Sequence, residues 1–293
     1  MSGKTLDLSI VILNFNTEAL TRVCLQTVFA SRLGPYTMEV IVCDNGSTDG
    51  SIAMVKNEFP EVILIENKKN AGFAAGNNPG MKRAKGRYIL LLNSDTEMPK
   101  GTLLAMISFM DENPQAGAAT CKVLLPDGNL DPACHRGFPT PWVAFTYVSK
   151  LEKLFPKSKI FGEYHQGYKD FSAVHEVDCI TGAFFLVRRR VIQEVGLLDE
   201  DFFMYGEDID WAYRIRTKGW KIFYNPAATI LHKKKQSGRS NNDKRKQIQT
   251  ETYFHTYNWL FFKKHYGKKR PVLSFFVSVF YKARLSMLEH LHV

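Results

Sequence analysis

The stretch "LSIVILNF" (Leu8–Phe15) decides the fold that this sequence predicts. It is a near-continuous apolar run, which is typical of a strand buried on both faces of a parallel sheet. The next segment, "TEALTRVCLQTVFAS", places Leu20, Val23 and Cys24 near the i, i+3, i+4 spacing of an amphipathic helix. The pair therefore predicts the first strand and the first helix of an alternating sheet.

The same alternation continues through the first hundred residues. Further strands are expected at 38–45, 62–67 and 87–95, and the helices between them at 50–59 and 75–84. This order predicts an α/β fold with a doubly wound, mostly parallel sheet and right-handed crossovers. Beyond Pro99 the patterns predict a helix at 101–114, loops with short elements at 126–178, a strand and a helix at 179–196, a helix at 211–219, and two short strands at 220–232 broken at Pro226.

Composition limits the classes of protein that fit. The 293 residues are 45% hydrophobic and 23% charged, enough for one large domain or a domain with a small appendage. The five cysteines form no CxxC pair, which argues against a disulfide framework or zinc finger and favours a reducing cytoplasm. Residues 232–293 hold 14 Lys and Arg against three Asp and Glu, a balance of +11, so the first 231 residues carry −1 of the total +10. An anionic partner is therefore expected only at the tail, and no motif for nucleic-acid binding accompanies it.

Polar residues follow each of the first four predicted strands. Ligands of such sheets bind beyond the carboxyl ends of the strands. One crevice is therefore expected to be lined by Asn14, Asn16, Asp44, Asn45, Asn67, Asn70, Asn93, Ser94 and Asp95.

The motif "LLNSDTEMP" places Asp95 directly after an apolar strand. A carboxylate there can bind a divalent cation, which would offset the negative charge that grows on a leaving diphosphate. The alternative is an Asx-turn that ends the strand, with "SDTE" as a capping box. His232 also follows a predicted strand. A lone histidine is most often structural or exposed, but Asp95 and His232 with open positions would suit a cation that also binds diphosphate oxygens.

Two turn-rich segments offer further contacts. In "CDNGSTDGS", Asp44 is placed to accept hydrogen bonds from a base or ribose, while the other residues shape the turn. In "NAGFAAGNN", Gly72 and Gly76 allow a ligand to approach the backbone closely, and Asn77 lies where a helix begins. The segment is neither a GxGxxG nor a Walker A motif, so a generic dinucleotide fold is not favoured.

The stretch "MYGEDIDWAYRI" carries three acids at the expected start of a helix. Asp210 faces Arg214 at i+4, so a helix ion pair explains it. Glu207 and Asp208 lie in the first turn, where the helix dipole favours anions whatever the function. Asp208 is the least well explained, because it shares its face with Trp211 rather than with solvent.

In this order, the stretches "SIVILNFN", "VCDNGSTDGS", "NAGFAAGNN", "LLNSDTE", "TGAFFLVRR" and "GLLDEDFFMYGEDIDWAYR", followed by His232, resemble the family-2 inverting glycosyltransferases of the GT-A fold. They span Ser9 to His232 and lie closest to the bacterial rhamnosyltransferase-like branch. The resemblance implies a GT-A domain, with a Rossmann-like, mostly parallel sheet, over residues 1–235. Its nucleotide-binding half would be 1–98 and its acceptor and catalytic half 99–235, leaving 236–293 as a basic loop and a C-terminal helical extension.

The resemblance also implies roles for single residues. Asp208 matches the general base of the family's "ED" motif. Asp95 and His232 match its metal ligands, so Mn²⁺ or Mg²⁺ is the expected cofactor, although Asn93 replaces the first aspartate of the DxD motif. The nucleotide sugar is expected to contact Leu13, Asn14, Asn16, Asp44, Asn70, Gly72, Phe73, Asn77, Asn93, Ser94 and Asp95. The acceptor site is expected to be shaped by Thr181, Gly182, Glu207 and Trp211, and a basic lid over the diphosphate to use Lys235, Ser237 and Arg239.

The branch favours dTDP-L-rhamnose as the donor, with a UDP- or GDP-hexose as the alternative. The expected acceptor is a hydroxyl of a saccharide or of a polyprenyl-diphosphate-linked saccharide, in cell-surface polysaccharide synthesis. A non-catalytic nucleotide-sugar-binding protein is the more distant alternative. The tail mixes aromatic residues with lysines, which suits a helix on an anionic membrane surface, but packing on the domain or a homodimer interface explains it equally well. The expected location is cytoplasmic, and peripheral on the inner face of the cell membrane if the tail binds lipid.

Overall fold

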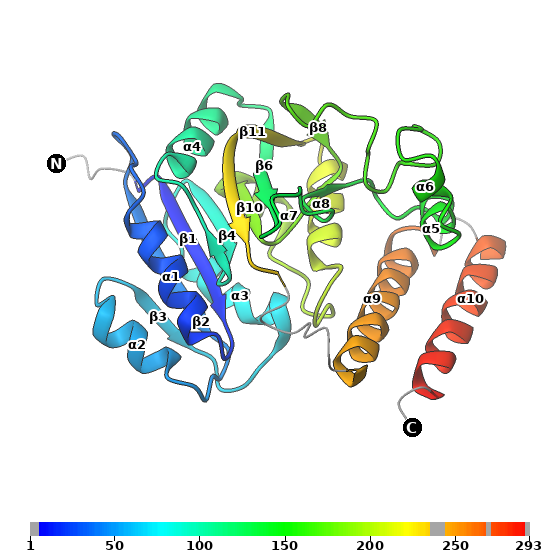
Figure 1. Cartoon of the computed structure of the whole chain (residues 1–293), viewed down its shortest axis with the longest axis horizontal. Coiled ribbons are helices and arrows are strands. Elements are labelled where there is room, and N and C mark those ends of the chain that lie inside the picture. The colour runs from blue at the N-terminus through cyan, green and yellow to red at the C-terminus, as the bar shows by residue number, and fades with distance from the viewer. Residues whose placement is uncertain (1–5, 235–243, 268–270, 291–293) are drawn as a thin grey trace.

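The computed structural model describes residues 6–234, 244–267 and 271–290, and its first hundred residues form the predicted alternating sheet (Figure 1). Four parallel strands lie in the order β3 (Ile63–Glu66), β2 (Met38–Asp44), β1 (Leu8–Asn14) and β4 (Tyr88–Asn93). The connecting helices are α1 (Glu18–Phe29), α2 (Ser51–Glu58) and α3 (Gly72–Arg83). The doubly wound arrangement is therefore confirmed, and α3 begins three residues before the expected start.

The sheet continues past β4 with strands of mixed direction. β10 (Phe184–Arg188) runs antiparallel to β4, and beyond it lie β6 (Ala116–Leu124), β11 (Lys221–His232) and β5 (Thr96–Glu97), with β8 (His175–Val177) also paired to β11. The prediction of two short strands at 220–232 is wrong, because β11 is one strand. Its register against β6 shifts between Asn225 and Thr229, and this bulge accommodates Pro226, which cannot donate to a ladder. β6 was not predicted at all.

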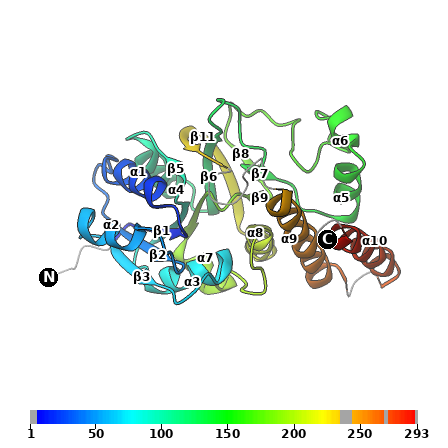
Figure 2. The same ribbon diagram turned by 60° about the horizontal axis from the view of Figure 1, so that its bottom comes forward.

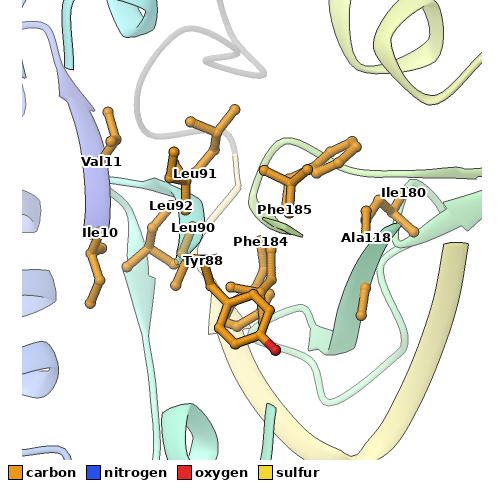
Figure 3. Packing of buried hydrophobic residues seen from close by; sticks show 14 of the residues in the cluster. Ile10, Val11, Tyr88, Leu90, Leu91, Leu92, Ala118, Ile180, Phe184 and Phe185 are labelled. Atoms are coloured by element: carbon orange, nitrogen blue, oxygen red, sulfur yellow. The ribbon is translucent and has the colours of Figure 1, made fainter. Parts of the chain in front are cut away.

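The core lies on both faces of the central strands (Figure 3). Val11, Leu91 and Phe185 point to one face, and Ile10 and Leu90 point to the other. All five are at most 1% exposed. Burying one such aliphatic side chain stabilises the fold by about 2 kcal/mol, so a strand covered on both faces needs an apolar residue at nearly every position. This is the physical reason for the pattern in "LSIVILNF".

The remaining elements cover the second half of the sheet and extend beyond it. They are α4 (Thr102–Glu112), α7 (Arg189–Val195), α8 (Glu207–Thr217), the paired strands β7 (His135–Arg136) and β9 (Cys179–Ile180), α5 (Pro141–Val148), α6 (Leu151–Leu154), α9 (Lys244–His265) and α10 (Pro271–His290). In two views, α5, α6 and α10 lie at the end of the molecule away from β3 (Figures 1 and 2). Among the described helices, none has the length and hydropathy needed to cross a membrane.

Candidate functional site

A pocket of about 500 Å³ opens where the carboxyl ends of β1 and β4 meet the start of α8. Its wall brings together segments that are far apart in the sequence. Thirteen of the residues predicted for the site line it, namely Leu13, Asn45, Asn70, Gly72, Phe73, Asn93, Ser94, Asp95, Thr181, Gly182, Glu207, Asp208 and His232. The residues predicted for the metal and the base, and some of those predicted for the donor and the acceptor, therefore share one pocket.

Other predicted residues lie behind this wall. Asn14 donates a hydrogen bond of 2.6 Å to Asp44, whose other carboxylate oxygen accepts the backbone N–H groups of Gly46 and Ser47 at 3.1 and 2.8 Å. Asp44 is only 1% exposed. In this structure the pair holds the turn after β2.

Three further residues are also placed away from the pocket. Asn16 lies beside a separate shallow hollow and accepts the backbone N–H of Thr48, and Asn77 donates to the backbone oxygen of Phe73 within α3. The indole of Trp211 is fully buried and donates to the backbone oxygen of Gly196 at 3.0 Å, so it packs the core under α8. The predicted lid residues Lys235, Ser237 and Arg239 lie outside the described residues.

Asp95 and His232 meet at the ends of β4 and β11. His232 Nε2 lies 3.2 Å from Asp95 Oδ1, and His232 Nδ1 lies 3.0 Å from Asp131 Oδ2. Burial would lower the pKa of His232, but hydrogen bonds to Asp131 and Asp95 outweigh it and raise the pKa to about 9. Lys234 donates to the second oxygen of Asp131 at 2.7 Å. Asp131 thus has two cationic partners, although sequence patterns gave no sign of it.

This arrangement fits a divalent cation. Metal-bound histidines commonly donate their second ring N–H to a carboxylate, as Nδ1 is placed to do here toward Asp131. Nε2 and Asp95 then face the pocket together, and Nε2 would bind a cation after losing its proton. The described residues contain no group of three His, Cys, Asp or Glu side chains able to hold a metal. An ion at Asp95 and His232 would therefore leave positions for ligand oxygens or water.

A sharp turn presents two carboxylates at the start of α8. Gly206 has φ +89°, and a Cβ there would meet the ring of Phe202 at 3.1 Å. Two residues after it, Asp208 Oδ2 accepts a 2.5 Å hydrogen bond from Arg136 Nη2, and its Oδ1 accepts the N–H of Ile209. Arg136 comes from β7, and both side chains are nearly buried. Burial would lower the pKa of Arg136, but the charge of Asp208 raises it, so the ion pair is held at neutral pH.

Glu207, expected as a first-turn helix acid that shapes the acceptor site, is deeply buried. It is 5% exposed, and its Oε2 is buried without a hydrogen-bond partner among the described residues. Burial, and secondarily the charge of Asp208, raise the pKa of Glu207 to about 8. At neutral pH this carboxyl is largely protonated, whereas Asp208 beside it is paired with Arg136.

The predicted pair of Asp210 with Arg214 is confirmed at 2.7 Å, but it belongs to a larger buried cluster. Lys264 and His265 of α9 contact Asp210 Oδ1 at 2.8 and 2.7 Å. Burial would raise the pKa of Asp210, but these partners lower it to about 2. The cluster fixes α8 against α9.

The pocket therefore combines three chemical capacities. Asn70, Asn93 and Ser94 offer polar groups at the strand ends, and Asp95 and His232 can hold a cation. The Asp208 carboxylate, although paired, keeps lone pairs for a further donor. Such a pocket suits an anionic ligand beside a group that loses a proton.

Comparison with known proteins gives a family match and a similar curated chain. The family description "Glycosyl transferase family 2" matches residues 9–196. The chain is 28% identical over 211 residues to an N-acetylglucosaminyl-diphospho-decaprenol L-rhamnosyltransferase of Mycobacterium tuberculosis, covering 68% of each chain.

Two solved structures share the fold. One is the mannosyltransferase PcManGT from Pyrobaculum calidifontis in complex with GDP-Man and Mn²⁺, with a TM-score of 0.59, 15% identity, and coverage of 99% of this chain and 86% of that one. The other is TarS from S. aureus in complex with UDP, with a TM-score of 0.55, 15% identity, and coverage of 87% and 66%. The chain thus spans just under two thirds of the latter structure. At these identities, both show the GT-A-like fold alone.

Proposed function

Because the chain belongs to glycosyl transferase family 2, we propose that it is an inverting, metal-dependent enzyme that transfers L-rhamnose from dTDP-L-rhamnose. The acceptor would be a hydroxyl of a saccharide or of a polyprenyl-diphosphate-linked saccharide, in cell-surface polysaccharide synthesis. The observation that carries the proposal is the presence of Asp208 and the Asp95–His232 pair in one pocket. The choice of rhamnose is supported by the mycobacterial relative.

Inversion requires one in-line displacement at the anomeric carbon. The acceptor hydroxyl forms the new C–O bond as the bond to the diphosphate breaks, and its proton passes to a base. Asp208 takes that role, since its hydrogen bonds from Arg136 and Ile209 orient both oxygens and leave lone pairs free. When bound by Asp95 and His232, a divalent ion would neutralise charge on the departing diphosphate.

The donor is assigned to the half of the pocket formed by residues 1–98. Asn70, Asn93 and Ser94 supply polar groups there. Gly72 has φ +83°, and a Cβ on it would lie 2.2 Å from the backbone oxygen of Phe203, so only glycine fits that wall. Residues 99–235, which contribute Thr181 and Gly182, would receive the acceptor.

The base assignment is tested with Asp208→Asn. We expect this variant to bind the nucleotide sugar as the wild type does and to lose about 10²–10⁴-fold in turnover, which is the usual contribution of a general base. Asp201→Asn, at an exposed acid on the preceding turn, is the matched control and should retain full turnover. Turnover of Asp208→Asn at the wild-type rate would exclude Asp208 as the base.

The donor assignment is tested by thermal shift with Mn²⁺ or Mg²⁺ and a panel of nucleotide sugars. A ligand present at 100 times its Kd stabilises the folded state by about 2.7 kcal/mol, so the true donor should raise the Tm most. A larger shift with a UDP- or GDP-hexose would replace rhamnose by the alternative donors, which the UDP and GDP-Man complexes of the structural neighbours make the next choice. Donor binding without turnover on any acceptor would favour a non-catalytic binding protein.

A further inference from the structure

Helix α10 has an apolar face that points away from the protein. Phe275, Phe276, Val279, Phe280 and Met287 are between 45% and 65% exposed. At 100° per residue these positions fall on one side of the helix, in a continuous stripe. A surface helix of a globular protein normally shows the opposite pattern, with its apolar side inward.

The other face of α10 is held by α9, so the stripe is fixed outward. Tyr281 and Leu288 are 8% and 2% exposed on the inner side. Arg284 of α10 donates to Glu251 and His255 of α9 at 3.3 and 3.4 Å. Turning the stripe inward would break these contacts.

A second segment at the same end of the molecule exposes large apolar side chains. It runs through α5 and α6 to residue 160, next to α10 in both views (Figures 1 and 2). Its exposed residues are Trp142, Phe145, Val148, Leu154, Phe155 and Ile160, each 47% to 71% exposed. The stripe on α10 and this segment are together called the apolar end. Tyr147 of α5 and Phe254 of α9 also line the pocket, so the apolar end adjoins the proposed site.

Positive charge flanks both parts of the apolar end. Lys150, Lys153, Lys157 and Lys159 are exposed along the α5–α6 segment, and Lys282 lies at the edge of the stripe on α10. The one acid between residues 140 and 160, Glu152, is buried beneath it and paired with His165. Two copies of this chain meeting through the apolar end would bring like charges together, whereas an anionic lipid surface is complementary to them.

We propose that the apolar end is a docking surface for an anionic membrane leaflet, with the aromatic residues of α10 and α5 entering the headgroup region. Aromatic side chains flanked by lysines match the chemistry of that interface. Only the purpose of docking rests on the proposed function, because docking would bring the pocket to a lipid-carried acceptor. Docking itself needs neither donor nor turnover.

The test is co-sedimentation of the full chain with vesicles of phosphatidylcholine alone or mixed with phosphatidylglycerol. We expect binding to the anionic vesicles only, weakening as salt is raised. Phe276→Glu combined with Phe280→Glu should reduce the bound fraction about tenfold, because it removes two aromatic groups and adds the sign of charge that the membrane repels. Val174→Glu is the matched control, since Val174 is 48% exposed outside the apolar end.

Equal sedimentation of the wild type and the double variant, or no sedimentation of the wild type, would overturn the proposal. A different result would be that the wild type is a dimer by gel filtration, the double variant is a monomer, and neither binds vesicles. In that case a second copy of the chain covers the apolar end.

Turnover on a water-soluble acceptor separates this proposal from the enzymatic one. The double variant should retain it, whereas Asp208→Asn should lose it while binding vesicles normally.

Discussion

Replacing Glu207 with glutamine should stabilise the folded chain relative to the wild type by an amount that grows with pH. The carboxyl is 5% exposed, its Oε2 has no hydrogen-bond partner among the described residues, and it adjoins Asp208, which is paired with Arg136. Its pKa is raised from 4.5 to about 8. Glutamine has almost the same shape and stays neutral. The variant therefore removes one event, the ionisation of a buried acid.

The direction of this pH dependence follows from the pKa values of Glu207 in the folded and unfolded states. Because the folded-state value lies above the unfolded one, the proton on Glu207 stabilises the fold fully below about pH 4.5, and this contribution is lost as pH rises through about 8. The loss is about 1.4 kcal/mol per pH unit within that window. It reaches roughly 3 kcal/mol by pH 7 and about 5 kcal/mol above pH 8. The glutamine variant has no such loss.

The assay is urea unfolding of both proteins at about pH 5, 7 and 9 and constant ionic strength, with the free energy of unfolding taken from each curve. Glu61→Gln, at an exposed acid, is the control and should show no trend. A free-energy difference between Glu207→Gln and wild type that stays constant from pH 5 to 9 would refute the reasoning. So would the same trend in the control.

Three further predictions concern residues in the pocket wall and behind it. Asp131→Asn should weaken Mn²⁺ binding about 10–100-fold by titration, because His232 loses the carboxylate that orients it; unchanged affinity would count against that role. Arg136→Met should cost about 3–5 kcal/mol in urea unfolding by leaving Asp208 buried and unpaired, and adding Asp208→Asn should restore part of it. Strictly additive costs would mean that the two side chains are not coupled. Gly72→Ala should cost about 1–3 kcal/mol, since φ is +83° and the new Cβ would clash with backbone, and a Tm equal to wild type would contradict this.

The first half of the fold could be predicted because each of its strands has a recognisable apolar run. Strands covered on both faces need apolar side chains throughout, and their polar ends must lie at one edge of a parallel sheet. That rule placed Asp95 at the edge of the sheet, whereas His232 was assigned beside it from the chemistry of a cation site and from the family resemblance. β6 was missed because it lacks such a run. Its sequence, "AGAATCKVL", is mostly small residues that fit close packing without any distinctive alternation.

The residues that pair with the charged groups of the pocket could not be predicted in this way. Asp131 and Arg136 come from the irregular region 126–178, and they meet His232 and Asp208 across 101 and 72 positions of sequence. Such contacts depend on how loops close over the sheet, which no local period encodes. The protonated state of Glu207 likewise depends on burial from several elements. A helix-start pattern alone predicts a solvated acid there.

The buried Asp210 shows why the C-terminal helices are part of the site's framework. A carboxylate buried in the first turn of α8 would be costly alone, and α9 supplies two of its partners, Lys264 and His265. The helix that begins with Glu207 and Asp208 is therefore stabilised by the same α9 that carries α10 on its other side. Moving α9 away from α8, and α10 with it, would require breaking this buried ion cluster. If the apolar end docks on a membrane, the pocket is therefore held at a fixed height above it, which suits an acceptor whose reacting hydroxyl lies at a constant distance from its lipid.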